Sequence, residues 1–233
     1  MENRYRVLGI APYEGMKKLM SDLVEDYPEI DLTLFVGDLE EGLEIAHSNF
    51  HGSYDVVISR GGTAKMLRRN LPLPVVEIPV SMYDLLCSLK LAGASARAGK
   101  VSMVAFDNIT ANARLLCNLL DYDIDIRTVD DGPEAEAILA GMQQDCCEAI
   151  LCDAVSNAAA KRLGFNSFLI TSGPDSIRQA FEQALFLCRN QTRLREENLF
   201  FGNCSTVRSD RLSCWMTTGI STCPRWSTRP RDF

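Results

Sequence analysis

The chain has 233 residues, of which 46% are hydrophobic and 24% are charged, and its formal net charge is −7. This is enough apolar material for a sizeable core, as one large domain or two small ones. The residues before Asn203 are more acidic than the total, because the last segment carries five arginines against two aspartates. An acidic body binds the nucleic-acid backbone poorly, so no direct nucleic-acid contact is expected.

No hydrophobic run approaches the ~20 residues that a membrane-spanning helix needs, and the first residues show no secretory signal. The nine cysteines form no CxxC pair and have no ligand-like spacing with the two histidines. We therefore predict reduced thiols in a cytoplasmic protein, with no membrane contact, metal site or cofactor. Four cysteines lie in apolar segments typical of buried thiols, namely Cys87, Cys117, Cys152 and Cys188.

Apolar strands alternate with amphipathic helices in the first part of the chain. Strands are predicted at residues 5–11, 31–36, 56–58 and 72–80. Helices are predicted at residues 16–25, 38–47, 63–69 and 82–92. This alternation is typical of a parallel sheet with helices on both faces.

A stretch of small residues at 92–100 separates this part from a second series of the same kind. Strands are predicted at residues 101–106, 122–128, 149–152 and 165–170. Residues 107–110 lead into a helix predicted to run through Leu120, and further helices are predicted at 134–142 and 154–163. We therefore predict an α/β chain of two lobes, with the first at residues 1–95 and the second at 96–176.

A long helix is predicted over residues 177–202, apolar at first and highly polar from Arg189 to Asn198. We expect it to pack on the first lobe and to lead into a further module, with a homodimer partner as the other expectation. Residues 203–233 contain both tryptophans and show no helix or strand period. We expect this tail to be disordered or foreign to the natural protein.

An arginine and two glycines stand where the strand at 56–58 leads into the next helix. Gly61 and Gly62 permit a sharp turn, and the helix beginning at Thr63 would present free backbone N–H groups. These groups carry partial positive charge, and Arg60 can bind a carboxylate or phosphate through two parallel hydrogen bonds. The pattern allows two interpretations equally, an anion site and an ordinary strand–helix turn with a solvated arginine.

Further candidates lie where the other predicted strands end, because the loops of two open parallel lobes face a common cleft. Each hydroxyl or carboxylate among them also has a simpler interpretation as a helix N-cap. The full set of expected ligand-binding residues is Arg60, Gly61, Gly62, Thr63, Ser81, Asp107, Thr110, Asp153, Ser172 and Gly173. None of them is assigned a catalytic or metal-binding role.

The segments SRGGTA at 59–64 and LPVVEIPVSMYD at 73–84 resemble the N-terminal sensory domain of PrpR-type propionate-catabolism activators. The resemblance, over residues 4–198, implies two flavodoxin-like lobes with parallel sheets, an effector cleft between them and a long C-terminal helix. It implies a bacterial sigma-54-dependent transcriptional activator, in which this domain controls downstream regulatory and ATPase domains. It also implies a small anionic effector similar to 2-methylcitrate. The sequence contains no Walker A motif, so ATP hydrolysis is not expected of these residues.

Two other functions stay open. Racemases with two α/β lobes use a cysteine from each lobe as paired acid and base, and Cys152 ends a predicted strand of the second lobe. The first lobe offers no matching cysteine, because Arg60 and Gly61 occupy the corresponding place. The other possibility is a pure dimerisation or interaction module, in which Arg60 is structural.

Overall fold

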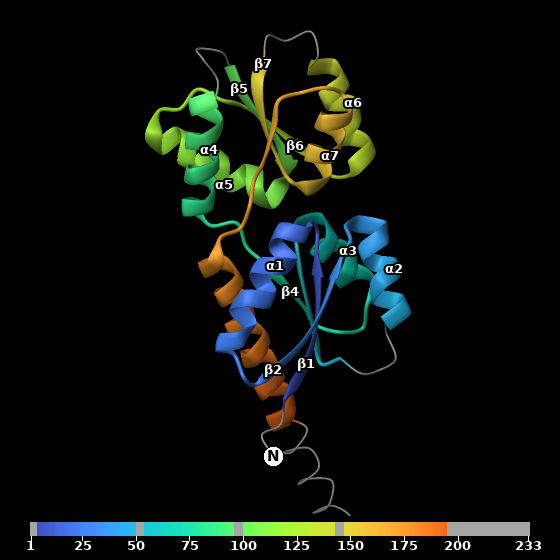
Figure 1. Cartoon of the computed structure of the whole chain (residues 1–233). Helices are drawn as coiled ribbons and strands as arrows, with labels where there is room; N and C mark the ends of the chain where they lie inside the picture. Colours follow the sequence, from blue (N-terminus) through green and yellow to red (C-terminus); the bar gives the residue numbers. More distant parts are fainter. Residues whose placement is uncertain (1–3, 50–53, 96–99, 143–146, 195–233) are drawn as a thin grey trace, which may run out of the picture. The chain divides into compact units, whose positions relative to one another are not determined.

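The computed structural model describes residues 4–49, 54–95, 100–142 and 147–194. These residues form two four-stranded parallel sheets, each covered by helices on both faces (Figure 1). This confirms the predicted α/β class with two flavodoxin-like lobes. In the described part of the chain, no helix is both long and apolar enough to cross a lipid bilayer. The tail at 203–233 lies outside the described residues.

The sheet of the first lobe has the strand order β2-β1-β3-β4. Its strands are β1 (Tyr5–Ala11), β2 (Ile30–Val36), β3 (Val56–Arg60) and β4 (Val75–Ile78). The helices between them are α1 (Glu14–Leu23), the short 3₁₀ helix η1 (Val24–Asp26), α2 (Leu39–Asn49) and α3 (Gly61–Asn70). The central strands β1 and β3 are mostly buried on both faces, as expected for parallel strands that helices cover on each side.

Two apolar clusters fill the two faces of this sheet. Helices α2 and α3 pack on one face through Ala46, Ala64 and Leu67. Helix α1 packs on the other through Met16 and Met20, and Figure 1 shows it on the side opposite α2 and α3.

The second lobe repeats this plan, with the strand order β6-β5-β7-β8. Its strands are β5 (Lys100–Phe106), β6 (Asp125–Val129), β7 (Cys147–Cys152) and β8 (Ser167–Leu169). Its helices are α5 (Asp107–Leu120), α6 (Gly132–Met142) and α7 (Ala154–Arg162). Helix α5 covers one face of the sheet, and α6 and α7 cover the other.

Each lobe is completed by a helix that follows the other lobe's sheet in sequence. Helix α4 (Met82–Ser95) follows β4, but Leu85, Leu89 and Ala92 pack in the core of the second lobe. The last described helix, residues 174–194, follows β8, but its stripe from Ile177 to Cys188 packs in the core of the first lobe. The chain therefore crosses between the lobes twice, and residues up to Cys188 form one compact unit. The division at residues 95 and 96 stays a prediction.

Two local expectations were wrong. Strand β3 continues through Arg60 and α3 begins at Gly61, because the positive φ of +54° at Gly61 turns the chain without an intervening loop. Cys87 is exposed, whereas Cys117, Cys152 and Cys188 are buried. The helical period explains the difference, since Leu85 and Leu89 face the core and Cys87 lies on the outer face of α4.

Candidate functional site

The first turn of α3 has no side-chain cap. Its N-cap residue is Arg60, which has extended backbone geometry and makes no capping hydrogen bond with its side chain. Gly61 and Gly62 follow as the first helical residues. The N–H groups at this end of α3 are therefore positively polarised and have no side-chain partner in a cap.

Arg60 is a buried cation, with only 4% of its surface exposed. Its Nη2 donates a hydrogen bond of 2.7 Å to the carbonyl oxygen of Ile170, and its Nη1 donates one of 3.3 Å to the hydroxyl of Tyr13. Its Nε is buried and has no hydrogen-bond partner among the described residues. An unsatisfied donor on a buried charged group is costly, so the guanidinium has unused capacity to bind an acceptor.

Arg60 lines a cavity of about 20 Å³. That volume suffices for about one water molecule. Five of the predicted residues line it, namely Arg60, Gly61, Gly62, Thr63 and Asp153, together with Pro12, Phe106, Ile109, Ala154 and Val155. The structure thus brings half of the predicted set together at one place.

Asp153 faces the same cavity as the N-cap of α7. Its Oδ1 accepts the Ser156 N–H at 2.8 Å, and its Oδ2 accepts the Phe106 N–H at 2.9 Å. Burial raises the pKa of Asp153, although both N–H groups and the positive charge of Arg60 act in the opposite direction. The carboxyl therefore takes up a proton more readily than that of an exposed aspartate.

Thr63 contributes its backbone to the site, and its hydroxyl is already engaged. Its Oγ1 accepts the N–H of Leu39 at 3.0 Å and so holds the start of α2 against α3. The predicted role of its hydroxyl in ligand binding stays a prediction.

Phe106 covers the first turn of α3 and was missed by the sequence analysis. A Cβ atom placed on Gly62 would lie 2.7 Å from Cζ of Phe106, so the ring packs directly on the glycine backbone. Phe106 and Gly62 also line two larger cavities, of about 660 Å³ and about 210 Å³. The apolar end of a strand gave no sign of this role, because Phe106 reads in the sequence as core.

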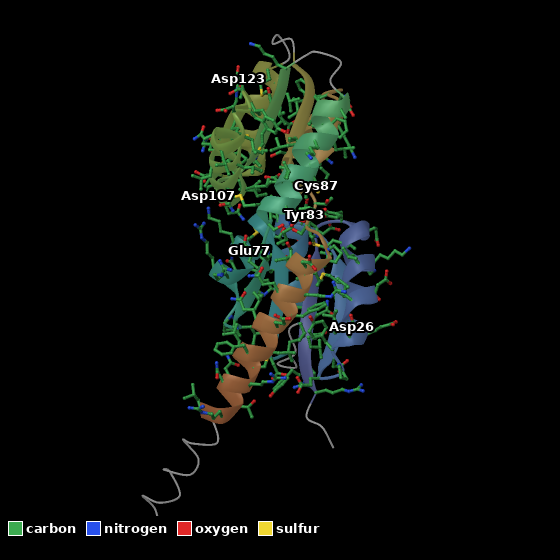
Figure 2. All side chains as sticks on the ribbon, turned by 90° about the vertical axis from the view of Figure 1, so that its left-hand side faces the viewer. Asp26, Glu77, Tyr83, Cys87, Asp107 and Asp123 are labelled. Atoms are coloured by element: carbon green, nitrogen blue, oxygen red, sulfur yellow. The ribbon has the colours of Figure 1, made fainter. Side chains whose placement is uncertain are left out.

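Asp107 lies at the smaller of these two outer cavities, where it pairs with Lys65 at 3.8 Å. Beside it, Asn108 donates a hydrogen bond of 2.6 Å to Glu77, and Figure 2 labels Glu77 and Asp107 close to one another. The predicted Thr110 is instead engaged within the second lobe, where its hydroxyl lies 2.8 Å from that of Thr128.

The remaining predicted residues, Ser81, Ser172 and Gly173, lie on the two segments that cross between the lobes. They gather around the buried carboxylate of Asp84, which accepts the N–H of Ser81 at 3.0 Å and that of Gly173 at 3.0 Å. Asp84 also accepts the Ser176 hydroxyl at 2.7 Å. The Ser172 hydroxyl donates to the Pro79 carbonyl at 2.8 Å, which joins the two crossings directly. These residues hold the crossings together and do not line the cavity beside Arg60.

Tyr13 was also missed as a site residue. Burial raises the pKa of its hydroxyl, which contacts both Arg60 and the backbone of Ser172. It therefore joins the guanidinium to the second crossing. The only signal in the sequence was its place in the loop after the first strand.

Two observations on the described residues concern metal binding and proton transfer. No group of three or more histidine, cysteine, aspartate or glutamate side chains could hold a metal ion there. Cys152, considered above as a proton-transfer residue, is fully buried in the core beneath α6 and α7.

Among solved structures, the chain is similar to an NtrC family transcriptional regulator from Clostridium acetobutylicum, with a TM-score of 0.71 and 18% identity. The match covers 81% of this chain and 98% of that one, and it shows that the two share a fold. A weaker likeness is to an allantoin racemase from Pseudomonas fluorescens, with a TM-score of 0.33, 14% identity, and coverage of 80% and 92%. No curated protein matches the chain.

The family comparison is more specific. The PrpR_N family, described as propionate catabolism activator, matches residues 27–193. This is well over half of the chain and includes strands β2 to β8, Arg60 and the two crossings. The chain therefore belongs to the PrpR_N family of propionate catabolism activators, and it is a sensory regulatory domain.

Proposed function

We propose that this chain is the ligand-sensing domain of a bacterial sigma-54-dependent transcriptional activator, and that it binds a small anionic metabolite between its two lobes. The observation that carries the proposal is the buried Nε donor of Arg60 beside the uncapped first turn of α3. The family suggests a carboxylate similar to 2-methylcitrate as the ligand. The domain would act in the cytoplasm on downstream regulatory and ATPase domains of the parent protein.

The chemistry of the site suits a carboxylate. A guanidinium binds a carboxylate with two parallel hydrogen bonds, and Arg60 has its Nε donor available for one of them. The N–H groups of Gly61 and Gly62 supply further donors at the positive end of the α3 dipole. Such a site recognises a negative charge and requires no catalytic group.

The lobes must separate for a ligand of this size to enter. The cavity at Arg60, about 20 Å³, is far below the roughly 300–1,000 Å³ typical of ligand pockets. Two crossing segments, held by Asp84 and by the Ser172–Pro79 hydrogen bond, provide the hinge about which the lobes could move. We therefore expect ligand binding to change the angle between the lobes.

The contacts of Arg60 provide a route for the signal. Its guanidinium holds the carbonyl of Ile170, which directly precedes the second crossing. Gly173 and Ser176, which follow, bond to Asp84 at the start of the helix at 174–194. An anion bound by Arg60 would alter the hydrogen bond between its guanidinium and Ile170. The helix at 174–194 would then change position, and this helix leads toward the downstream domains.

The test is a thermal-shift titration of the full chain with di- and tricarboxylates, with Arg60→Met and Arg60→Lys beside the wild type. A ligand at 100 times its Kd stabilises by about 2.7 kcal/mol, which raises Tm by about 5–10 °C in a chain of this length. We expect this shift in the wild type, a smaller one in Arg60→Lys and none in Arg60→Met. Arg178→Met, which removes a half-buried arginine paired with Asp26 and Asp175, serves as the control and should keep the full shift.

The alternative of a dimerisation or interaction module has one specific observation in its favour. Arg60 already fastens the second crossing through Ile170 and Tyr13, so it could be purely structural. In that case Arg60→Met lowers Tm without ligand, and no carboxylate shifts Tm in the wild type or in the variant. The same titration therefore distinguishes the two functions.

A further inference from the structure

The ring of Phe106 occupies the place over the first turn of α3 that an anion would need. Phe106 is the last residue of β5 in the second lobe, and it is 4% exposed. Its Cζ and Cε2 would lie 2.7 and 2.8 Å from a Cβ atom at Gly62, in the first lobe. Only glycine leaves room for this contact, so the ring seals the N-terminal end of α3 where the backbone donors begin.

The same ring is a wall shared by three cavities. The inner cavity of about 20 Å³ contains Arg60 in its lining, and the outer cavities measure about 660 Å³ and about 210 Å³. Phe106 and Gly62 line all three. Removal of the ring from Gly62 would therefore join the inner cavity, which Arg60 lines, to an outer cavity of a size that small ligands occupy.

The backbone of Phe106 is anchored, whereas its ring is held only by apolar packing. The N–H of Phe106 donates to the buried carboxyl of Asp153 at 2.9 Å, which ties it to the second lobe. Its ring tip contacts Gly62 of the first lobe. The ring can thus leave Gly62 by side-chain rotation or by separation of the lobes, and neither movement breaks the Asp153 bond.

The linings of the outer cavities indicate the kind of ligand. Lys65 lines both of them, and its ion pair with Asp107 is solvent-exposed and therefore weak. The larger cavity also contains Arg69 and three carboxylates, Glu40, Asp130 and Asp131. A lining of mixed charge suits hydroxyl groups, which donate to carboxylates, together with one carboxylate at Lys65, better than it suits a phosphorylated polyanion.

We propose that Phe106 is a movable partition, which leaves Gly62 when a small hydroxycarboxylate binds. One carboxylate then takes the place of the ring against Arg60 and the first turn of α3. The rest of the ligand lies in the outer cavities, with a second carboxylate at Lys65. This inference rests on the proposed function of Arg60, and it adds the residue that controls access to that site.

The experiment measures binding of citrate and acetate to the full chain by isothermal titration calorimetry. Phe106→Leu weakens the seal, so citrate should bind about fivefold tighter or more, because less of the protein is held in the closed form. Phe106→Ala removes the ring and should bind citrate at least as tightly as Phe106→Leu. Phe168→Leu makes the same change at a half-buried position packed on the second-lobe core, and it should match the wild type. Lys65→Met should weaken citrate more than acetate.

Failure of the partition and failure of the proposed function give different results. If the wild type binds citrate and requires Arg60, but both Phe106 variants match it while melting cooperatively, the partition is wrong and the function stands. If neither the wild type nor Phe106→Leu binds citrate or acetate at millimolar concentrations, both proposals are overturned. If Phe106→Leu binds citrate and the wild type does not, the result supports the partition.

Discussion

The carboxylate of Asp84 makes the contacts whose loss should most weaken the connection between the lobes. It accepts three hydrogen bonds, from the N–H groups of Ser81 and Gly173 and from the Ser176 hydroxyl. Ser81 lies on the first crossing, whereas Gly173 lies on the second. The Ser81 hydroxyl also accepts the N–H of Asp84 at 3.0 Å, which completes a capping box at the start of α4.

The expected cost of Asp84→Ala follows from these bonds. A hydrogen bond to a charged group contributes about 1.5–3 kcal/mol, so the sum of three such bonds is an upper limit on the loss in the free energy of unfolding. The N–H groups of Ser81 and Gly173 are only partly buried and can regain water after the substitution. We therefore expect Asp84→Ala to lower the free energy of unfolding by about 3 kcal/mol, equivalent to about 6–12 °C in Tm. Asp84→Asn keeps one acceptor oxygen and should cost about half as much.

Urea unfolding followed by circular dichroism, together with calorimetric Tm values, measures both variants. Asp22→Ala removes an exposed aspartate of α1 and is the matched control, with an expected change within about 0.5 kcal/mol. A loss for Asp84→Ala no larger than that of the control would refute the reasoning, since the crossings would then be held by other contacts.

Three further predictions concern the junction of the lobes and two buried titratable groups, a carboxyl and a thiol. Gly62→Ala should destabilise by about 1–3 kcal/mol through its clash with the Phe106 ring, and a double-mutant cycle with Phe106→Leu should recover most of that loss; additive costs would exclude the contact. The raised pKa of Asp153 means that the folded state binds its proton more tightly, so this contribution to stability is full below about pH 4 and is lost as pH rises through the folded pKa. The stability of the wild type should therefore fall relative to Asp153→Asn above pH 4, and parallel pH profiles would contradict this. Burial and the nearby Asp55 raise the pKa of Cys188 to about 11, so the free energy of unfolding should fall as pH rises from about 9 to about 11, with no such fall in Cys188→Ala.

The sequence determined the class of fold because the signals for it are local. Apolar runs bounded by Gly, Pro and Asp marked each strand, and the 3.6-residue period marked each helix. Their strict alternation allows few arrangements besides parallel sheets covered on both faces. The Arg60–Gly61–Gly62 stretch was predicted as a strand–helix junction for the same reason, and Asp153 caps α7 as its residue type allows.

The tertiary structure alone decided which residues meet across the junction of the lobes. Gly173 bonds to Asp84 over a separation of 89 residues, and Arg60 bonds to Ile170 over 110. Local periodicity carries no information on such pairs, so it could not place Ser81, Ser172 and Gly173 at the crossings; their role in ligand binding stays a prediction. Phe106 reads as an ordinary core residue, and only the packing of one lobe on the other places its ring on Gly62. The sequence by itself thus determined the fold, the family and the location of the arginine, whereas long-range packing decided which side chains surround it.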